Sequence, residues 1–275
     1  MGCRITLGLL YCDAIVDPMT IPSRGCDTGL RVPNLIHARA LPAAVIAIAF
    51  AILARAMGAV TDGGALAGVL IAFLLMLPTG VTGFVPLLSV FVLTLISTRW
   101  GYKRKQRLGV AETRRGRTAS QVLANLSAAA VCVVPVIWVP KLDDLLLVAS
   151  AAALAEAAAD TVSSEVGQAT ARAAYLITDF RDVPVGTNGA ISVEGTLSGC
   201  VAACIVAWVS AVVGWVDWSA TPVIALAATA GMFLDSVMGA TWENSGKLGN
   251  DAVNFISTVF AADLALIITM IMQRV

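Results

Sequence analysis

The chain has 275 residues, of which 58% are hydrophobic and only 13% are charged, and its formal net charge is zero. A soluble domain is typically about 45–50% apolar and about 25% charged, so this composition argues against a soluble enzyme and predicts an integral membrane protein. The neutral charge balance indicates no nucleic-acid partner. We therefore expect an all-α, polytopic transmembrane helix bundle with about 6–8 membrane segments.

The first forty residues differ from the rest of the chain. They lack the long apolar stretch and small-residue cleavage site of a secretory signal, and they contain three prolines and four arginines. We interpret residues 1–40 as an irregular or interfacial extension that precedes a transmembrane domain of residues 41–275. The six cysteines form no C-x-x-C pair, and small apolar packing explains Cys200 and Cys204 better than metal binding does.

Eight apolar runs follow, and most are long enough for a helix to cross the roughly 30 Å hydrocarbon core, which takes about 20 residues. The second and third runs are short, and they could instead form a hairpin that does not fully cross. The runs lie near residues 41–57, 64–78, 84–99, 119–139, 142–164, 191–214, 219–241 and 252–273.

Positive charge is distributed unevenly between the two sets of alternating loops. The loops near 58–63, 100–118, 165–190 and 242–251, with Arg55 and Arg99 at their borders, hold 12 of the 18 Lys and Arg residues. Because positively charged loops stay in the cytoplasm, this side is predicted to be cytoplasmic and both termini to lie outside. We thus expect an inner-membrane protein whose active site is on the cytoplasmic side.

Two apolar runs end in acidic motifs on that side. In "EAAADTVSSEVGQ", Glu156, Asp160, Ser164 and Gln168 recur every four residues and so share one helix face. A carboxylate at membrane depth costs about 2.5–3.5 kcal/mol even on lenient scales, so such residues normally face a protein interior and mark an ion or substrate path. Carboxylates beside hydroxyl and amide groups suit Mg²⁺, whereas buried hydrogen bonds between helices are the alternative. The second motif, "GMFLDSVMGATWE", contains Asp235, Ser236, Gly239 and Glu243.

A glycine-rich stretch, "VPVGTNGAISVEGT", leads into the sixth run. Glycine lets a backbone approach a ligand closely, and a helix N-terminus attracts anions, so this stretch is a candidate phosphate site. It is not a Walker motif, because GK[ST] is missing, and a plain turn before a helix is the alternative. The candidate residues are Gly186, Thr187, Asn188, Gly189, Ser192, Gly195 and Thr196.

Cations and amides near the same side complete the candidate site. Lys247, Arg181 and Arg117 are candidates for neutralising phosphate charge. In "GRTASQVLAN", Gln121 and Asn125 share one face of the fourth run. Hydrogen bonding between helices explains these two amides equally well.

The motifs QVLAN, ADTVSSEVG, VPVGTNGAISVEGT, GMFLDSVMGATWE and NDAVN occur in this order over residues 60–275. In this they resemble the DUF92 family, also called the TMEM19 family, whose best-known members are plant phytyl-phosphate kinases. The resemblance implies a membrane enzyme that transfers the γ-phosphate of CTP, or of another nucleoside triphosphate, to a prenyl monophosphate lipid such as phytyl phosphate. The family motifs fall on Asp160, Ser164, Glu165, Gly186–Gly189, Ser192, Gly195, Thr196, Asp235, Ser236, Gly239, Asn250, Asp251 and Asn254.

From the resemblance and the residues together we select Asp160, Glu165 and Asp235 as candidate ligands of a Mg²⁺ cofactor. Lys247 is a further catalytic candidate. Three alternatives remain. One is an ion-coupled transporter with Asp160 and Asp235 as midplane ion sites, although the motifs cluster toward one face. Another is a CTP-dependent cytidylyltransferase of lipid phosphates, which would release pyrophosphate, and the last is a non-enzymatic membrane scaffold. The sequence does not indicate an oligomeric state.

The two acidic motifs also suggest an internal repeat. "DTVSS" begins at Asp160 and "DSVMG" at Asp235, and each is followed by a loop with glycine and asparagine and by a return span. Such a parallel repeat would place Asp160 and Asp235 opposite each other, with Asn188 and Asn254 approaching the same pocket. Chance similarity in so biased a composition is the alternative.

Overall fold

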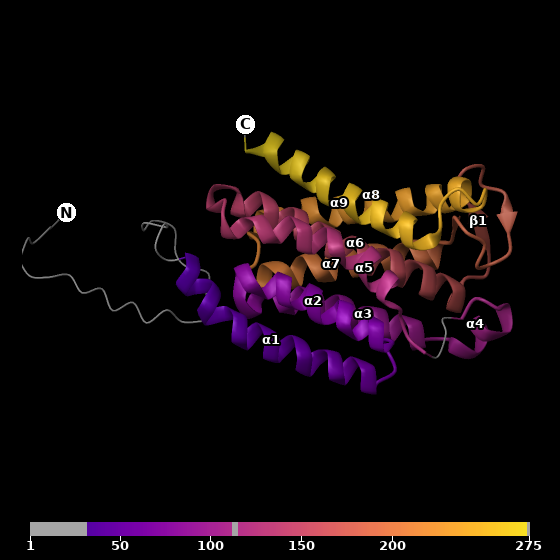
Figure 1. The fold of residues 1–275 in the computed structure, drawn as a ribbon. Helices are drawn as coiled ribbons and strands as arrows, with labels where there is room; N and C mark the ends of the chain where they lie inside the picture. The colour runs from indigo at the N-terminus through magenta and orange to yellow at the C-terminus, as the bar shows by residue number, and fades with distance from the viewer. Residues whose placement is uncertain (1–31, 112–114, 274–275) are drawn as a thin grey trace, which may run out of the picture.

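The structure is a computed structural model that describes residues 32–111 and 115–273. Long helices run side by side along one axis, and a small sheet lies at one end (Figure 1). The predicted all-α, polytopic bundle is confirmed. The helices are α1 (Val32–Ala56), α2 (Asp62–Thr79), α3 (Phe84–Arg99), α4 (Tyr102–Leu108), α5 (Ala119–Val133), α6 (Asp143–Thr170), α7 (Val193–Val212), α8 (Thr221–Met238) and α9 (Asn250–Met272).

Short helical turns join some of these helices. They are η1 (Gly80–Gly83), η2 (Val134–Ile137), η3 (Pro140–Leu142), η4 (Trp218–Ala220) and the π-helical η5 (Gly239–Glu243). Within the described residues, 7 helical segments are long and apolar enough to cross a membrane, and one of them, Asp62–Arg99, comprises α2, η1 and α3.

The α2–α3 segment is a hairpin. The Arg99 guanidinium donates to the Met57 carbonyl (2.8 Å), so α3 returns to the end of the bundle where α1 finishes and α2 begins. At 1.5 Å per residue the two helices are about 27 Å and about 24 Å long, close to the thickness of a hydrocarbon core.

The first helix begins earlier than the apolar run suggested. It starts at Val32 and has Pro33 in its first turn, where proline is tolerated because no helical hydrogen bond is lost. The predicted boundary at residue 40 therefore falls inside α1. The remainder of the predicted extension, residues 1–31, lies outside the described residues.

Helix α6 forms the centre of the bundle. In its apolar window 83% of the residues are buried, against 22–44% for the other segments. Alanines dominate this helix, and glycines on its neighbours allow close packing, since a Cβ added at Gly199 would lie 2.8 Å from the Ala159 carbonyl oxygen. The buried polar side chains of α6, such as Glu156, therefore face other helices, including α8 and α9, and not lipid.

The loops that carry the predicted motifs gather at one end of the bundle. Val60 and Arg117 form a parallel β-bridge there, and α4 lies close to the end of α6. The sequence analysis expected no sheet, but β1 (Ala174–Leu176) pairs antiparallel with β2 (Asp182–Val183) and β3 (Ala190–Ile191) at this end (Figure 1). These are the loops predicted to be cytoplasmic, and the side of the membrane on which they lie stays a prediction.

Candidate active site

A polar cavity of about 240 Å³ opens at the loop end of the bundle. Helices α5, α6, α8 and α9 and the loop before α7 form its walls. Most of the candidate residues named from the sequence line it, although they come from five separate stretches of the chain. They are Arg117, Gln121, Asn125, Asp160, Ser164, Glu165, Gly186, Thr187, Asn188, Gly189, Ser192, Asp235, Ser236, Gly239, Glu243, Asn250 and Asn254.

The two aspartates predicted to be catalytic meet inside this cavity. The carboxyl groups of Asp160 on α6 and Asp235 on α8 lie within hydrogen-bonding distance of each other. Two like charges this close repel each other unless a proton or a cation lies between them. The pair is therefore an arrangement that a shared cation would stabilise.

Helix α9 holds Asp235 in place. The Ser257 hydroxyl donates to Asp235 Oδ2 at 3.3 Å. The orientation of the Asn254 amide that satisfies its partners has its nitrogen donating to the same oxygen at 3.2 Å and its oxygen accepting from Asn125 Nδ2 at 3.2 Å. A chain of hydrogen bonds thus links α8, α9 and α5, and it fixes the direction in which the carboxylate points.

A third acidic side chain lies deeper in the bundle, one helical turn before Asp160 on α6. Glu156 is 1% exposed and is close enough to Asp160 and Asp235 to interact with both. Among the described residues its Oε1 has no hydrogen-bond partner. A Cβ added at Gly231 would lie 2.6 Å from Glu156 Cγ, so only glycine at that position leaves room for this glutamate.

Arg117 brings positive charge to the acidic pair. Its main chain is fixed because its amide donates to the Ala59 carbonyl and its carbonyl accepts from the Thr61 amide, both at 3.0 Å. Its guanidinium donates to Thr161 Oγ1 at 3.4 Å and interacts electrostatically with Asp160. The cavity lining therefore contains a cation beside the Asp160–Asp235 pair.

The donor set of this cavity fits Mg²⁺ bound jointly with a substrate. The described residues contain no group of three or more His, Cys, Asp or Glu side chains that could hold a metal by themselves. Mg²⁺, however, is commonly held by one or two carboxylates together with water and substrate phosphates. Asp160 and Asp235 provide such a pair of oxygen donors.

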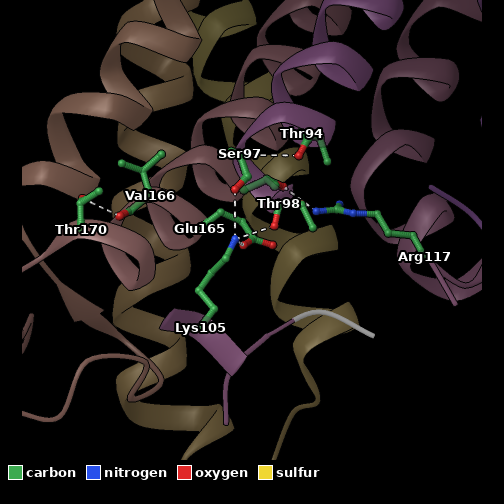
Figure 2. Close-up of polar contacts among 9 residues, drawn as sticks. Thr94, Ser97, Thr98, Lys105, Arg117, Glu165, Val166 and Thr170 are labelled. Atoms are coloured by element: carbon green, nitrogen blue, oxygen red, sulfur yellow. Dashed lines mark hydrogen bonds and ion pairs between the residues drawn. The ribbon is translucent and has the colours of Figure 1, made fainter. Parts of the chain in front are cut away.

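Glu165, the third predicted metal ligand, has another partner. Its carboxylate forms an ion pair with Lys105 of α4, whose side chain is 0% exposed (Figure 2). The Lys105 ammonium also donates to the main-chain carbonyls of Ser97 (3.0 Å) and Thr98 (2.7 Å) at the end of α3. Glu165 lines the cavity, but its charge is already neutralised, and the geometry favours a role in joining α3 and α4 to α6.

The glycines of the loop before α7 serve its packing against other parts of the chain as well as the approach of a ligand. Gly186 and Gly189 have φ of +94° and +73°, a region that side chains rarely adopt. A Cβ added at Gly189 would lie 2.3 Å from the Ala240 amide nitrogen, so this glycine lets the loop lie against the end of α8. The Asn244 amide also donates to the Asn188 carbonyl at 3.3 Å. The loop thus forms a fixed wall of the cavity.

Two of the hydroxyl groups predicted to bind a ligand already form hydrogen bonds with nearby main-chain atoms. Thr187 Oγ1 donates to the Pro184 carbonyl at 2.7 Å. Ser192 Oγ accepts from the Gly195 amide at 3.1 Å and so caps the N-terminus of α7. Gln121 likewise forms a capping box with Thr118 at the start of α5.

Some candidates lie outside the cavity lining. Lys247 is exposed, and Gly195 and Thr196 are within α7 and do not line the cavity. A Cβ added at Gly195 would lie 2.7 Å from the Ser163 carbonyl oxygen, so its small size serves the packing of α7 on α6. Arg181 is exposed and pairs with Asp179 at 3.4 Å. Of the cations considered from the sequence, Arg117 is the one that lines the cavity.

The sequence analysis did not select Lys105 or Ser257. Lys105 lies in a cluster of basic residues, and nothing in the sequence separates the buried lysine from its exposed neighbours. Ser257 follows Asn254 by three residues and so shares its helix face, which is a signal that could have identified it.

The geometric expectation of the internal repeat is met, since Asp160 faces Asp235 and both Asn188 and Asn254 line the same cavity. The connecting parts differ, however. A three-stranded sheet joins α6 to α7, whereas the π-helical η5 and a turn join α8 to α9. Common descent of the two halves stays a prediction.

The fold and the cavity together define an integral membrane protein with a polar site at one end of its transmembrane helices. A family model described as "Integral membrane protein DUF92" matches residues 45–262, and the chain belongs to this family. The resemblance found from the motifs is thereby confirmed.

Relatives of this chain occur in bacteria, plants and archaea. It is 36% identical over 190 residues to the uncharacterized membrane protein sll0875 of Synechocystis sp.. The matched region covers 68% of this chain and 74% of the relative. It is 32% identical over 218 residues to Protein VTE6, chloroplastic, of Arabidopsis thaliana, covering 75% of this chain and 64% of that protein. It is 27% identical over 231 residues to the uncharacterized membrane protein MJ0933 of Methanocaldococcus jannaschii, covering 82% and 92%. No solved structure matches the chain.

Proposed function

We propose that this protein is a membrane prenyl-phosphate kinase, which transfers a phosphate from CTP or another nucleoside triphosphate to a phytyl or polyprenyl monophosphate. The observation that carries the proposal is the meeting of Asp160 and Asp235 in a polar cavity at the ends of transmembrane helices. Membership of the DUF92 family and the resemblance to its plant phytyl-phosphate kinases support the choice of acceptor.

The reaction requires little covalent participation by the protein. An oxygen of the acceptor monophosphate forms a bond to the γ-phosphorus, the bond from that phosphorus to the β–γ bridging oxygen breaks, and its electron pair leaves with the nucleoside diphosphate. The second pKa of a phosphate monoester is about 6, so the attacking group is already ionised at neutral pH. Catalysis then depends on positioning two anionic substrates and on neutralising their charge.

The lining of the cavity supplies both requirements. Asp160 and Asp235 would hold Mg²⁺, which when bound supplies positive charge to the phosphates. Arg117 adds a fixed cation beside this pair. Hydrogen bonds from Ser257 and Asn254 hold the Asp235 carboxylate in one direction, so that little reorganisation is needed when the substrates bind.

Other groups would bind phosphate oxygens. The amides of Asn250 and Gln121 and the main chain of Gly186–Gly189 line the same cavity. We further propose that this end faces the cytoplasm of an inner membrane, where the nucleotide is available, because 12 of the 18 Lys and Arg residues lie in or beside the loops at this end.

The purified protein, incubated with CTP, Mg²⁺ and a panel of prenyl monophosphates, tests the proposal. The expected products are CDP and a lipid diphosphate in equal amounts. Release of pyrophosphate would instead indicate a lipid-phosphate cytidylyltransferase. No turnover, combined with ion-driven solute uptake into vesicles, would indicate a transporter, and either result would refute the kinase.

A further inference from the structure

A second cavity, of about 430 Å³, lies beside the polar one. It is bounded by α1, α2, α3 and α5, and apolar side chains form most of its wall, among them Phe50, Leu87, Val90, Phe91 and Leu95. Cavities of about 300–1,000 Å³ with such walls are typical of sites for small organic ligands. We call this cavity the apolar groove.

The apolar groove adjoins the polar cavity. Arg117, Gln121 and Asn125 line both of them, so these three residues form the boundary between the two spaces. A ligand with an apolar body and an anionic end could occupy the groove and place its anionic end beside Arg117.

Residues on two sides of the groove bear on why the helices leave it open. Protein interiors contain few voids larger than a water molecule, so an opening of this size needs a structural cause. On one side, Gly64 and Gly68 of α2 line the groove, and a Cβ added at Gly68 would meet no atom within 4 Å. On the other side, Lys105 joins the end of α3 to Glu165 of α6 and so fixes this end of α3 against α6 (Figure 2).

Aromatic rings lie at the deeper part of the groove. Phe50 of α1 contacts Phe84 and Phe91 of α3 edge-to-face, with ring centroids 5.1 Å and 4.8 Å apart. The lining residues Phe50 and Leu87 are those farthest along their helices from the loop end. A chain entering beside Arg117 would therefore meet this aromatic cluster at its far end.

We propose that the apolar groove binds the hydrocarbon chain of the lipid-phosphate substrate, whose phosphate then lies at Arg117 beside Asp160. The nature of the substrate rests on the proposed function, whereas the site rests on the groove itself. A nucleotide does not suit these walls, because its base and sugar require hydrogen-bond partners. An isoprenoid chain is apolar throughout and requires none.

Gly68 offers a direct way to fill the groove. A Cβ built at Gly68 meets no atom within 4 Å and Gly68 lines the groove, so Gly68→Phe is expected to direct its ring into the opening. Leu66→Phe is the matched control, because Leu66 is on the same helix, is 73% exposed and does not line the groove. Both variants introduce the same side chain into α2.

The experiment uses the full-length protein in lipid nanodiscs and a phytyl-length prenyl monophosphate that carries a diazirine near the end of its chain. After irradiation, label is expected on peptides of α1, α2 and α3 that line the groove, and excess phytyl monophosphate should compete with it. Gly68→Phe is expected to reduce this labelling about tenfold or more, while Leu66→Phe leaves it unchanged. Label that is confined to bilayer-facing residues, or that resists competitor and Gly68→Phe alike, would overturn the proposal.

Two further outcomes separate this proposal from the proposed function. Labelling needs no turnover, so specific label in the groove without phosphate transfer would support the groove and refute the kinase. Phosphate transfer without label in the groove would support the kinase and refute the groove. If Gly68→Phe fails to purify, Gly68→Leu and Thr94→Phe, which fills the groove from α3, provide the same comparison.

Discussion

Asp160 on α6 and Asp235 on α8 lie far apart in the chain, yet their carboxyl groups are within hydrogen-bonding distance of each other. Helix α6 is the most buried of the membrane segments, and this position places Asp160 against its neighbour α8. Such a pair is costly in a membrane protein unless it binds a cation or a proton, which is why we place the chemistry there.

Removal of either charge should abolish turnover. We expect Asp160→Asn and Asp235→Asn each to lower activity roughly 10²-fold or more, because fixed charges near transferring groups commonly contribute that much. Both variants should still insert and purify, since asparagine keeps the shape and hydrogen-bonding ability of the side chain. Asp179→Asn is the control, as Asp179 is an exposed carboxylate at the same end that does not line the cavity. Near-wild-type activity in either Asp160→Asn or Asp235→Asn would refute the proposal that these two carboxylates hold the metal.

The Lys105–Glu165 pair should matter for stability more than for chemistry. Lys105→Met would leave the buried Glu165 carboxylate without its cation, and the loss of one partner from a buried pair typically costs about 3–5 kcal/mol. Lys103→Met, on the exposed side of the same helix, should have little effect on thermal unfolding in detergent. The double variant Lys105→Met/Glu165→Leu should recover part of the loss. If Glu165→Gln eliminated activity at unchanged stability, Glu165 would instead act on the substrate.

Gly189 lies in the loop wall of the cavity, and comparison with Gly246 separates the cost of a steric clash from the cost of a positive φ. Gly189 and Gly246 both have positive φ, +73° and +71°, but a Cβ would clash with Ala240 at Gly189 and would meet no atom within 4 Å at Gly246. Gly246→Ala should therefore cost only the conformational term of about 1–2 kcal/mol. Gly189→Ala should cost more and also lower kcat, because the loop would move away from α8. Equal effects of the two variants on the unfolding temperature and kcat would show that the contact with Ala240 is unimportant.

The long helices could be predicted from the sequence because membrane spanning imposes a minimum apolar length, and the eight apolar runs correspond to α1–α3 and α5–α9. The start of α1 at Val32 was missed, since a helix can continue beyond the apolar run that identifies it. The three-stranded sheet was also missed. Its strands have two or three residues each, too few for an alternating pattern to be recognised.

Site residues could be predicted where the side chain is energetically costly in an apolar segment. They could not be predicted where the packing of the folded chain alone determines whether a residue is buried. Asp160 and Asp235 stand out because carboxylates are rare in apolar runs. Lys247 and Lys105 look alike in the sequence, yet the first is exposed and the second is completely buried. Gly195 appeared to be a ligand contact, but its neighbours show that it allows two helices to approach.

The sidedness of the bundle can be tested with two engineered cysteines in a cysteine-free background. Gln106 on α4 and Ser219 in η4 are both exposed and lie at opposite ends of the bundle, and neither substitution removes a positive charge. A membrane-impermeant maleimide added to intact cells should label Ser219→Cys, and it should label Gln106→Cys only after permeabilisation. The opposite pattern would invert the predicted topology and place the cavity outside.

The most direct test of the central claim follows the phosphorus atom itself. Purified protein is given CTP labelled at its γ-phosphate, Mg²⁺ and phytyl monophosphate, and the lipid products are separated, with the Asp235→Asn variant run in parallel. We predict that the label appears in the terminal phosphate of the lipid diphosphate, in an amount equal to the CDP formed, and that it is lost in the variant. Label that remains in free phosphate or pyrophosphate, or that enters the lipid equally well with Asp235→Asn, would contradict a phosphate transfer centred on Asp160 and Asp235.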